Sequence, residues 1–278
     1  MRIGGGIERP YHNPDEWYQL VKELGYRAVL TPVTTESPQA EKEAYLACVR
    51  EHDLVISEVG AWCNPLSTDE KTRKEAISYC RKQLLLTEEL SANCCVNIAG
   101  SKGEKWDGFC MENYEEDTYA LIVDTVREII DGVKPERTFY TLEPMPWMVP
   151  SSPEEYLQLI KDVDRKAFAV HLDFTNMINC PERFVKQDAF IESCFKILGP
   201  YIKSIHGKDV TMSEHLPCII EETMPGKGTV DYRKVAKLCD ALGKDMPLMV
   251  EHLPDFESYK QAAGYVREQA ILAGVQLP

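Results

Sequence analysis

Four side chains of metal-binding type lie at or near the ends of four separate apolar runs in this sequence. Three are carboxylates and one is an imidazole, so together they offer mostly oxygen ligands. Such a donor set suits Mn²⁺, Mg²⁺ or Co²⁺ better than a metal that selects thiolates. The pattern predicts a site for one divalent metal ion, with Mn²⁺ as the first choice and Mg²⁺, Co²⁺ or Zn²⁺ as alternatives. The predicted ligands are Glu143, Asp173, His206 and Glu251.

Taken singly, each of these residues has a simpler interpretation, because a charged residue at a strand end commonly caps a helix or forms an ion pair. A structural network of ion pairs would need basic partners on the same runs, and Lys208 is the only obvious one. Charged side chains are rarely buried unless they are paired or bind a metal. Considered together, the four residues therefore favour the metal site.

The four runs have the features of buried parallel strands: they are short, rich in β-branched or aromatic residues, and end in a polar group. In a (β/α)8 barrel, the carboxyl ends of the strands face one pocket, where catalytic residues gather. A barrel would therefore bring the four predicted ligands together. The runs cover residues 138–144, 168–174, 202–210 and 247–253.

The alternation of short apolar runs and amphipathic stretches extends along the whole chain. Eight strand–helix units without a break in composition predict an α/β fold, a single (β/α)8 or TIM barrel that forms one domain over residues 1–278. An open doubly wound sheet is the alternative, but it usually needs a phosphate loop, and Gly4-Gly5-Gly6 lacks the G-x-G-x-x-G spacing. The expected strands are 2–7, 28–32, 54–62, 94–99, 138–143, 167–173, 202–206 and 247–251, and the expected helices are 14–24, 37–52, 69–90, 113–132, 153–163, 185–198, 231–242 and 255–273.

The longest expected loops follow particular strands, and three of the four follow a strand with a predicted ligand. Loops of this length in a compact domain are more often functional than incidental. We therefore expect them to surround the site. They cover residues 100–112, 144–152, 174–183 and 210–229.

The composition limits the classes of function. The formal net charge is −14, from 45 acidic and 31 basic residues, and this balance disfavours nucleic acid and anionic membranes as partners. No window holds the roughly 18 consecutive apolar residues of a membrane span, and the first residues lack the apolar core of a signal peptide. The ten cysteines form no paired CxxC motifs, so we expect reduced thiols in a cytoplasmic protein. The sequence leaves open whether the protein forms a homo-oligomer.

Five short motifs resemble those of the xylose isomerase-like TIM barrels, and the resemblance covers nearly the whole chain. This group contains sugar phosphate isomerases and epimerases, with a tagatose 3-epimerase type and an inosose dehydratase type. The resemblance implies that strands five to eight supply Glu143, Asp173, His206 and Glu251, in that order, to one divalent metal. The motifs are Leu142-Glu143-Pro, His171-Leu-Asp173, His206-Gly-Lys-Asp209, Pro225-Gly-Lys-Gly228 and Val250-Glu251-His.

The same resemblance implies an enzyme of carbohydrate metabolism, a metal-dependent isomerase or epimerase of a keto-sugar or cyclitol. Its reaction would be proton transfer through a metal-stabilised enediolate, with Glu143 and Glu251 on opposite faces of the substrate. A dehydratase or lyase on the same site is the alternative, and a non-catalytic sugar-binding subunit is the alternative of another class. Met145 stands where xylose isomerase has a Lys, which disfavours a hydride shift. Val149 stands where the tagatose type has a Glu.

Three further polar residues share the strands and loops of the predicted ligands. Lys208, two residues after His206, could act in catalysis by protonating or holding an oxyanion, or it could bind a phosphate or carboxylate. Alternatively, it could form an ion pair with Asp173 or Glu251. His171 could bind a sugar hydroxyl or support a ligand, or it could be a satisfied core histidine. Asn176 could bind a hydroxyl, or it could belong to an Asx turn.

Aromatic residues in the same loops predict a sugar-binding wall. Trp62 and Trp147 follow the third and fifth expected strands, where their rings could stack on the C–H faces of a sugar. Trp106 could belong to a lid. His252 alternates with the ligand Glu251, so we expect it to face away from the barrel interior.

Overall fold

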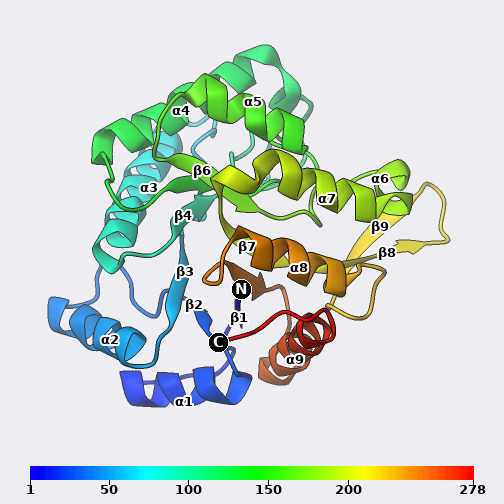
Figure 1. Ribbon diagram of the computed structural model, residues 1–278. Helices are drawn as coiled ribbons and strands as arrows, with labels where there is room; N and C mark the ends of the chain where they lie inside the picture. The colour runs from blue at the N-terminus through cyan, green and yellow to red at the C-terminus, as the bar shows by residue number, and fades with distance from the viewer.

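The computed structural model describes residues 1–278, and its main feature is a sheet of eight parallel strands that curls into a barrel (Figure 1). The strands follow the order β1-β10-β7-β6-β5-β4-β3-β2. The two end strands also meet, because the N–H of Arg27, just before β2, donates to the carbonyl oxygen of Ile3 in β1 at 2.9 Å. The predicted (β/α)8 fold is confirmed. The barrel strands are β1 (Arg2–Gly5), β2 (Ala28–Leu30), β3 (Val55–Gly60), β4 (Cys94–Asn97), β5 (Tyr140–Leu142), β6 (Phe168–Leu172), β7 (Ile202–Gly207) and β10 (Pro247–Val250).

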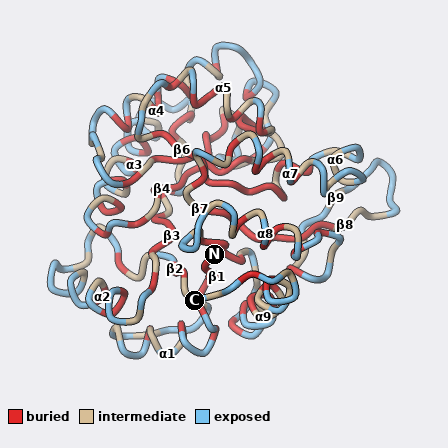
Figure 2. The backbone as a smooth tube through the Cα atoms, viewed as in Figure 1, coloured by how far each residue is buried: buried red, intermediate tan, exposed pale blue.

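Helices surround the barrel on its outside (Figure 1). Figure 2 shows buried residues along the strands and exposed residues on the outer sides of the helices, so the core lies within the barrel and beneath the helices. None of the helices is long and apolar enough to cross a membrane. The helices are α1 (Pro14–Leu24), α2 (Gln39–Glu51), α3 (Glu70–Leu90), α4 (Glu116–Val133), α5 (Pro153–Val163), α6 (Pro181–Val185), α7 (Gln187–Leu198), α8 (Tyr232–Leu242) and α9 (Phe256–Leu272), with 3-10 turns at Met111–Tyr114 and Gly199–Tyr201.

Polar side chains at the helix starts explain several boundaries. The side chain of Asn13 accepts the N–H of Glu16 at 2.9 Å, and that of Ser152 accepts the N–H of Glu155 at 3.2 Å. A cap of this kind typically contributes about 1 kcal/mol to stability. A proline follows each of these two caps, as expected where the first N–H has no helical partner.

The register of the strands carries the predicted ligands to one end of the barrel. Leu142 of β5 pairs with Val170 of β6, and Met249 of β10 pairs with His206 of β7. The residues that follow these strands therefore leave the sheet at the same edge. This edge is the carboxyl end, where parallel barrels place their active sites.

The prediction of one long loop is partly wrong. Residues 210–229 were expected to be irregular, but most of this segment belongs to an antiparallel hairpin of β8 (Asp209–Ser213) and β9 (Ile219–Thr223). The hairpin extends away from the barrel near α6 (Figure 1). Its strands are short and only Asp209 and Val210 in them are buried, so they lack the continuous apolar run that identifies a barrel strand in the sequence.

The buried carboxylate of Asp209 fixes the base of this hairpin. Its two oxygens accept the N–H groups of Val210, Gly226, Gly228 and Val230 at 2.9–3.1 Å. Two of these donors, the N–H groups of Gly226 and Gly228, belong to the turn at residues 225–228. The Asp209 side chain therefore binds the N–H groups of this turn. The hairpin is thus anchored directly after β7.

Replacing Asp209 with Ala should lower the free energy of unfolding by about 2–4 kcal/mol, because several buried N–H groups would lose their acceptor. Urea unfolding followed by circular dichroism measures this change. The exposed Glu214 in the hairpin tip makes no side-chain contact of this kind, so Glu214→Ala should leave stability within about 0.5 kcal/mol. Equal stability of the two variants would show that Asp209 does not anchor the hairpin.

Candidate metal centre and pocket

The structure brings the four predicted metal ligands together at the carboxyl end of the barrel. One possible ligand atom from each of Glu143, Asp173, His206 and Glu251 lies within 4.8 Å of those of the other three. The Nδ1 atom of His206 lies 2.7 Å from Glu251 Oε1, 3.2 Å from Glu143 Oε1 and 3.9 Å from Asp173 Oδ2. Four residues that are widely spaced in the sequence therefore form one buried cluster.

The chemistry of this cluster fits a divalent ion. Asp173 Oδ2 and Glu251 Oε1 are buried, and neither oxygen accepts a hydrogen bond of regular geometry, although both are in ion-pair contact with the Lys208 ammonium. Nearly all buried polar atoms have a hydrogen-bond partner, so two such oxygens side by side retain lone pairs for a cation. Three carboxylates with one imidazole form a donor set that Mn²⁺, Mg²⁺ and related ions accept.

Lys208 lies among the same oxygens and is 1% exposed. Its Nζ atom lies 2.7 Å from Asp173 Oδ2 and 3.4 Å from Glu143 Oε1, and it also forms an ion pair with Glu251. Burial alone would lower the pKa of Lys208, but the surrounding carboxylates outweigh burial and raise that pKa. The ion pairs considered as the alternative for Lys208 are thus present in the structure.

The three carboxyl groups differ in acidity although they share one site. Burial raises the pKa of Asp173 to about 7, because the nearby Lys208 offsets the loss of solvent only in part. For Glu251, burial is outweighed by the charges of His206 and Lys208, which lower its pKa to about 2. Asp173 is therefore the carboxyl group that retains a proton most readily.

Glu58 orients the imidazole of His206 and was not predicted from the sequence. It lies in β3, is 3% exposed, and places Oε1 at 3.1 Å from His206 Nε2. A carboxylate on one ring nitrogen leaves the other nitrogen facing the metal ligands, which is the usual support for a metal-binding histidine. The signal that could have identified Glu58 is a charged residue inside the apolar run of residues 54–62, since such residues are rarely buried without a partner.

The predicted sugar contact of His171 is wrong. This side chain is fully buried beneath the pocket, with Nδ1 at 2.5 Å from Ser204 Oγ and at 3.4 Å from Glu58 Oε2. Its ring packs edge-on against the ring of His206, with centroids 3.9 Å apart. Burial lowers the pKa of His171 to about 4, so the ring is neutral. His171 is a buried histidine whose Nε2 has no hydrogen-bond partner, so it is not fully satisfied, and its packing against His206 agrees with the predicted support of a ligand.

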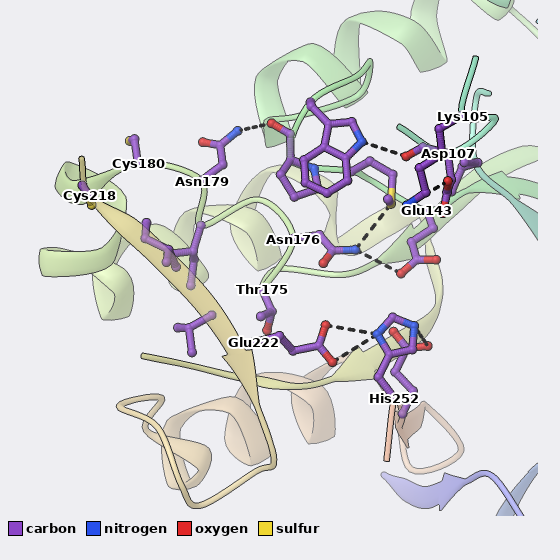
Figure 3. A pocket seen from close by; sticks show the side chains of 18 of the residues that line it. Lys105, Asp107, Glu143, Thr175, Asn176, Asn179, Cys180, Cys218, Glu222 and His252 are labelled. Carbon is purple, nitrogen blue, oxygen red and sulfur yellow. Dashed lines mark hydrogen bonds and ion pairs between the residues drawn. The ribbon is translucent and has the colours of Figure 1, made fainter. Parts of the chain in front are cut away.

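A cavity of about 880 Å³ opens above the cluster (Figure 3). Glu143 and Glu251 line it, as do the predicted sugar-binding residues Trp62, Trp147 and Asn176. Trp106, the expected lid residue in the loop of residues 100–112, also lines it.

Asn176 links two of the predicted ligands. Its Nδ2 donates to Glu143 Oε1 at 3.2 Å (Figure 3). It also donates to the carbonyl oxygen of Pro144 at 3.1 Å. Its backbone N–H donates to Asp173 Oδ1 at 2.8 Å, so the Asx turn at this point is made by Asp173. Contact of Asn176 with a substrate hydroxyl stays a prediction.

His252 was expected to face away from the barrel interior, and this expectation is wrong. Its backbone adopts φ 56°, a left-handed conformation that ends the strand alternation and directs the ring into the cavity. Nδ1 lies 3.1 Å from both oxygens of Glu222 in β9, and this hydrogen bond raises the pKa of His252 (Figure 3). Glu222 was missed as well, because it lies in the segment expected to be a loop.

Comparison with known proteins places these features in a family. Residues 18–269 match the family model described as xylose isomerase-like TIM barrel. An uncharacterized protein of Methanocaldococcus jannaschii, MJ1311, is 23% identical over 248 residues, which cover 87% of this chain and 75% of that one. A probable endonuclease 4 of Persephonella marina is 27% identical over 184 residues, which cover 63% of this chain and 61% of that one.

Solved structures share the fold at low sequence identity. L-ribulose 3-epimerase has a TM-score of 0.72 at 14% identity, covering 98% of this chain and 95% of that one. The probable 3-DHS dehydratase AsbF of Bacillus anthracis has a TM-score of 0.71 at 16% identity, with 93% and 95% covered. A xylose isomerase-like TIM barrel protein of Mycobacterium smegmatis, in complex with magnesium, has a TM-score of 0.67 at 17% identity, with 94% and 90% covered.

Replacing Asp173 with Ala should abolish stoichiometric binding of Mn²⁺, because it removes one ligand and leaves the cluster incomplete. Metal content after loading and dialysis, measured by elemental analysis, tests this. Asp188→Ala on the surface of α7 is the matched control and should retain about one equivalent, as the wild type should. One tightly bound ion in Asp173→Ala would reject the assignment.

Binding of Mn²⁺ should strengthen as the pH rises toward 7. The pKa of Asp173 is raised to about 7, so below this pH a proton occupies the carboxyl group and must leave before a metal binds. Titration calorimetry between pH 5.5 and 8 should show affinity rising by about tenfold or more per pH unit below 7. The affinity should continue to rise above pH 7, because the neighbouring carboxylates outweigh burial and raise the pKa of His206, which must also lose a proton to bind a metal. An affinity that does not change over this range would contradict the raised pKa.

Proposed function

Because the chain belongs to the xylose isomerase-like TIM barrel family, we propose that it is a divalent-metal-dependent isomerase or epimerase of a keto-sugar or keto-cyclitol, acting as one domain over residues 1–278. The observation that supports this proposal is that two carboxylates have two positions at once: they are predicted metal ligands and they also face the cavity. Glu143 and Glu251 belong to the ligand cluster and also line the cavity. Each can therefore reach a substrate held at the metal centre.

The proposed metal ligands are Glu143, Asp173, His206 and Glu251. When bound, a divalent ion would supply Lewis-acid stabilisation of negative charge on the substrate oxygens. Mn²⁺ is our first choice, with Mg²⁺, Co²⁺ or Zn²⁺ as alternatives, because the donor set is rich in oxygen. The magnesium complex of the Mycobacterium smegmatis protein supports a divalent ion in this fold.

The residues of the chain would supply the proton transfers. One of Glu143 and Glu251 would remove a proton from a carbon next to the keto group, which produces an enediolate. The other would return a proton from the opposite face and invert that carbon. The Lys208 ammonium, in contact with both carboxylates, would stabilise the negative charge that develops on oxygen. Asn176 would hold the carboxylate of Glu143 in position.

The walls of the cavity support a small carbohydrate as the substrate. Trp62 and Trp147 offer ring faces on which the C–H face of a sugar can stack, and Asn176 offers a polar contact. Asp107, Glu222 and the two ligand carboxylates make the lining acidic, which disfavours a nucleic-acid backbone. The free cysteines support a reducing, cytoplasmic location.

A dehydratase or lyase is the second candidate, supported by the similarity to the probable 3-DHS dehydratase. It would share the first proton abstraction but would expel a β-hydroxyl group instead of regaining the proton. A non-catalytic sugar-binding subunit is the less favoured alternative, because binding alone does not need two carboxylates in the cavity. Product analysis separates the two enzymes: an inverted carbinol indicates an epimerase, and a deoxy-keto product indicates a dehydratase.

Replacing Glu143 or Glu251 with Gln should reduce turnover of a keto-sugar by at least about 10²-fold, because each change removes a base and weakens the metal site. Reactions in D₂O followed by NMR should show deuterium entering the wild-type substrate or product. The variant that lacks the abstracting carboxylate should lose both exchange and turnover, whereas the other could retain exchange without inversion.

Glu221→Gln on the exposed side of β9 serves as the matched control and should exchange at the wild-type rate. Turnover without any solvent deuterium in substrate or product would reject proton transfer. That result would indicate a direct hydride shift instead.

A further inference from the structure

One pair of thiols lies beside the cavity without lining it and takes no part in the proposed reaction. The Sγ atoms of Cys63 and Cys80 are 3.4 Å apart. All ten cysteines of the chain are free thiols, and no other two of them make such a contact. Cys80 is buried in the middle of α3, whereas Cys63 is partly exposed in the segment between β3 and α3. A small oxidant therefore reaches Cys63 more readily than Cys80.

Hydrogen bonds from two barrel strands hold the two sulfur atoms in contact. Asn97 is fully buried at the end of β4, and its Nδ2 donates to Cys63 Sγ at 3.6 Å and to Cys80 Sγ at 3.5 Å. Its Oδ1 accepts the N–H of Cys63 at 3.3 Å. The hydroxyl of Tyr140 in β5 donates to Cys80 Sγ at 3.5 Å. The two thiols are thus kept at the short separation that a reaction between them requires.

The same hydrogen bonds make the two thiols chemically different. The contact with Cys63 lowers the pKa of Cys80 although burial acts in the opposite direction, and the bonds from Tyr140 and Asn97 lower it further. That contact also raises the pKa of Cys63. In thiol–disulfide exchange, the thiolate is the attacking group. Cys80 is therefore suited to attack the sulfur of Cys63 once that sulfur has been oxidised.

We propose that Cys63 and Cys80 are a site of oxidative modification, where a low-molecular-weight disulfide such as glutathione disulfide produces a reversible Cys63–Cys80 disulfide. In the first exchange, the Cys63 sulfur bonds to one sulfur of the oxidant, the S–S bond of the oxidant breaks, and one small thiol leaves with the proton of Cys63. In the second exchange, the Cys80 sulfur bonds to the Cys63 sulfur, and the other small thiol leaves with the proton of Cys80. Two protein thiols are oxidised, and one external disulfide is reduced to two thiols.

This disulfide would alter one wall of the cavity. An S–S bond is about 2.05 Å long, so the two sulfur atoms must approach each other by roughly 1.4 Å. Cys80 is held within a helix, so Cys63 is the residue that moves. Its neighbour Trp62 lines the cavity, and hydrogen bonds of 2.8 and 3.0 Å join its other neighbour, Asn64, to the backbone of Ser101. Oxidation would therefore displace the indole of Trp62, and the cavity would respond to the redox state.

Alkylation of free thiols followed by peptide mapping tests the disulfide. The reduced protein is incubated with excess glutathione disulfide, the remaining thiols are blocked, and tryptic peptides are analysed by mass spectrometry. Trypsin cuts between the two cysteines, so the cross-link joins peptides 51–71 and 75–81. This product should form in most chains and disappear on treatment with dithiothreitol. Free thiols at both positions after oxidation, or a glutathione adduct on Cys63 without the cross-link, would overturn the inference.

Three cysteine variants test the order of the exchanges. Cys80→Ala should retain a glutathione adduct on Cys63, because the attacking thiol is absent, and an unmodified Cys63 in this variant would reject the proposed order. Cys63→Ser should form neither the adduct nor the cross-link. Cys110→Ser is the matched control, because Cys110 is also partly exposed but contacts no other cysteine, and it should form the cross-link as the wild type does.

Tryptophan fluorescence of the same samples tests the effect on the cavity. Oxidation should shift the emission of the wild type, and dithiothreitol should restore it. Trp62→Phe should still form the cross-link but should lose most of this shift, and Cys63→Ser should show no shift. A complete cross-link with unchanged emission, or a shift that persists in Trp62→Phe, would overturn the displacement of Trp62.

Discussion

Mutual repulsion among three buried carboxylates is the constraint on which the site depends. One carboxylate oxygen from each of Glu143, Asp173 and Glu251 lies within 4.8 Å of the other two. Two like charges about 4 Å apart repel by roughly 4 kcal/mol at an effective dielectric constant of about 20. A cation must therefore be present in the cluster, or a proton must be bound to it. Lys208 and His206 supply positive charge, and the raised pKa of Asp173 adds a bound proton near neutral pH. A divalent ion would relieve the same repulsion more completely.

The barrel resists this repulsion because the groups beneath the cluster are hydrogen-bonded and closely packed. Glu58 holds one nitrogen of His206, and His171 packs against its ring while bonding to Ser204. These residues come from β3, β6 and β7, so several strands share the support of one imidazole. The position of His206 then fixes where the carboxylate oxygens converge. Such support from a second layer of residues is what keeps metal ligands in a defined geometry.

The sequence was sufficient to predict the fold and the four residues of the cluster, because both follow from local patterns. Apolar runs predicted the barrel strands, and the polar residue after each run predicted the cluster. The sequence was not sufficient for Glu222 and His252. Glu222 lies in a hairpin whose exposed strands have no apolar run, and His252 departs from strand alternation through a left-handed backbone. The role of His171 was ambiguous because alternation shows that a side chain points inward but not how deep it lies in the barrel.

The β8–β9 hairpin has a consequence for how this protein could diversify. It contributes Cys218, Ile220 and Glu222 to the cavity, its base is held by the carboxylate of Asp209, and it adds no strand to the barrel. The hairpin that forms one wall of the pocket is therefore an insertion outside the barrel sheet, whereas the residues of the cluster lie at the ends of the barrel strands. Evolution could lengthen, shorten or replace this insert without disturbing the metal ligands. Substrate preference and chemistry can thus change independently in this chain.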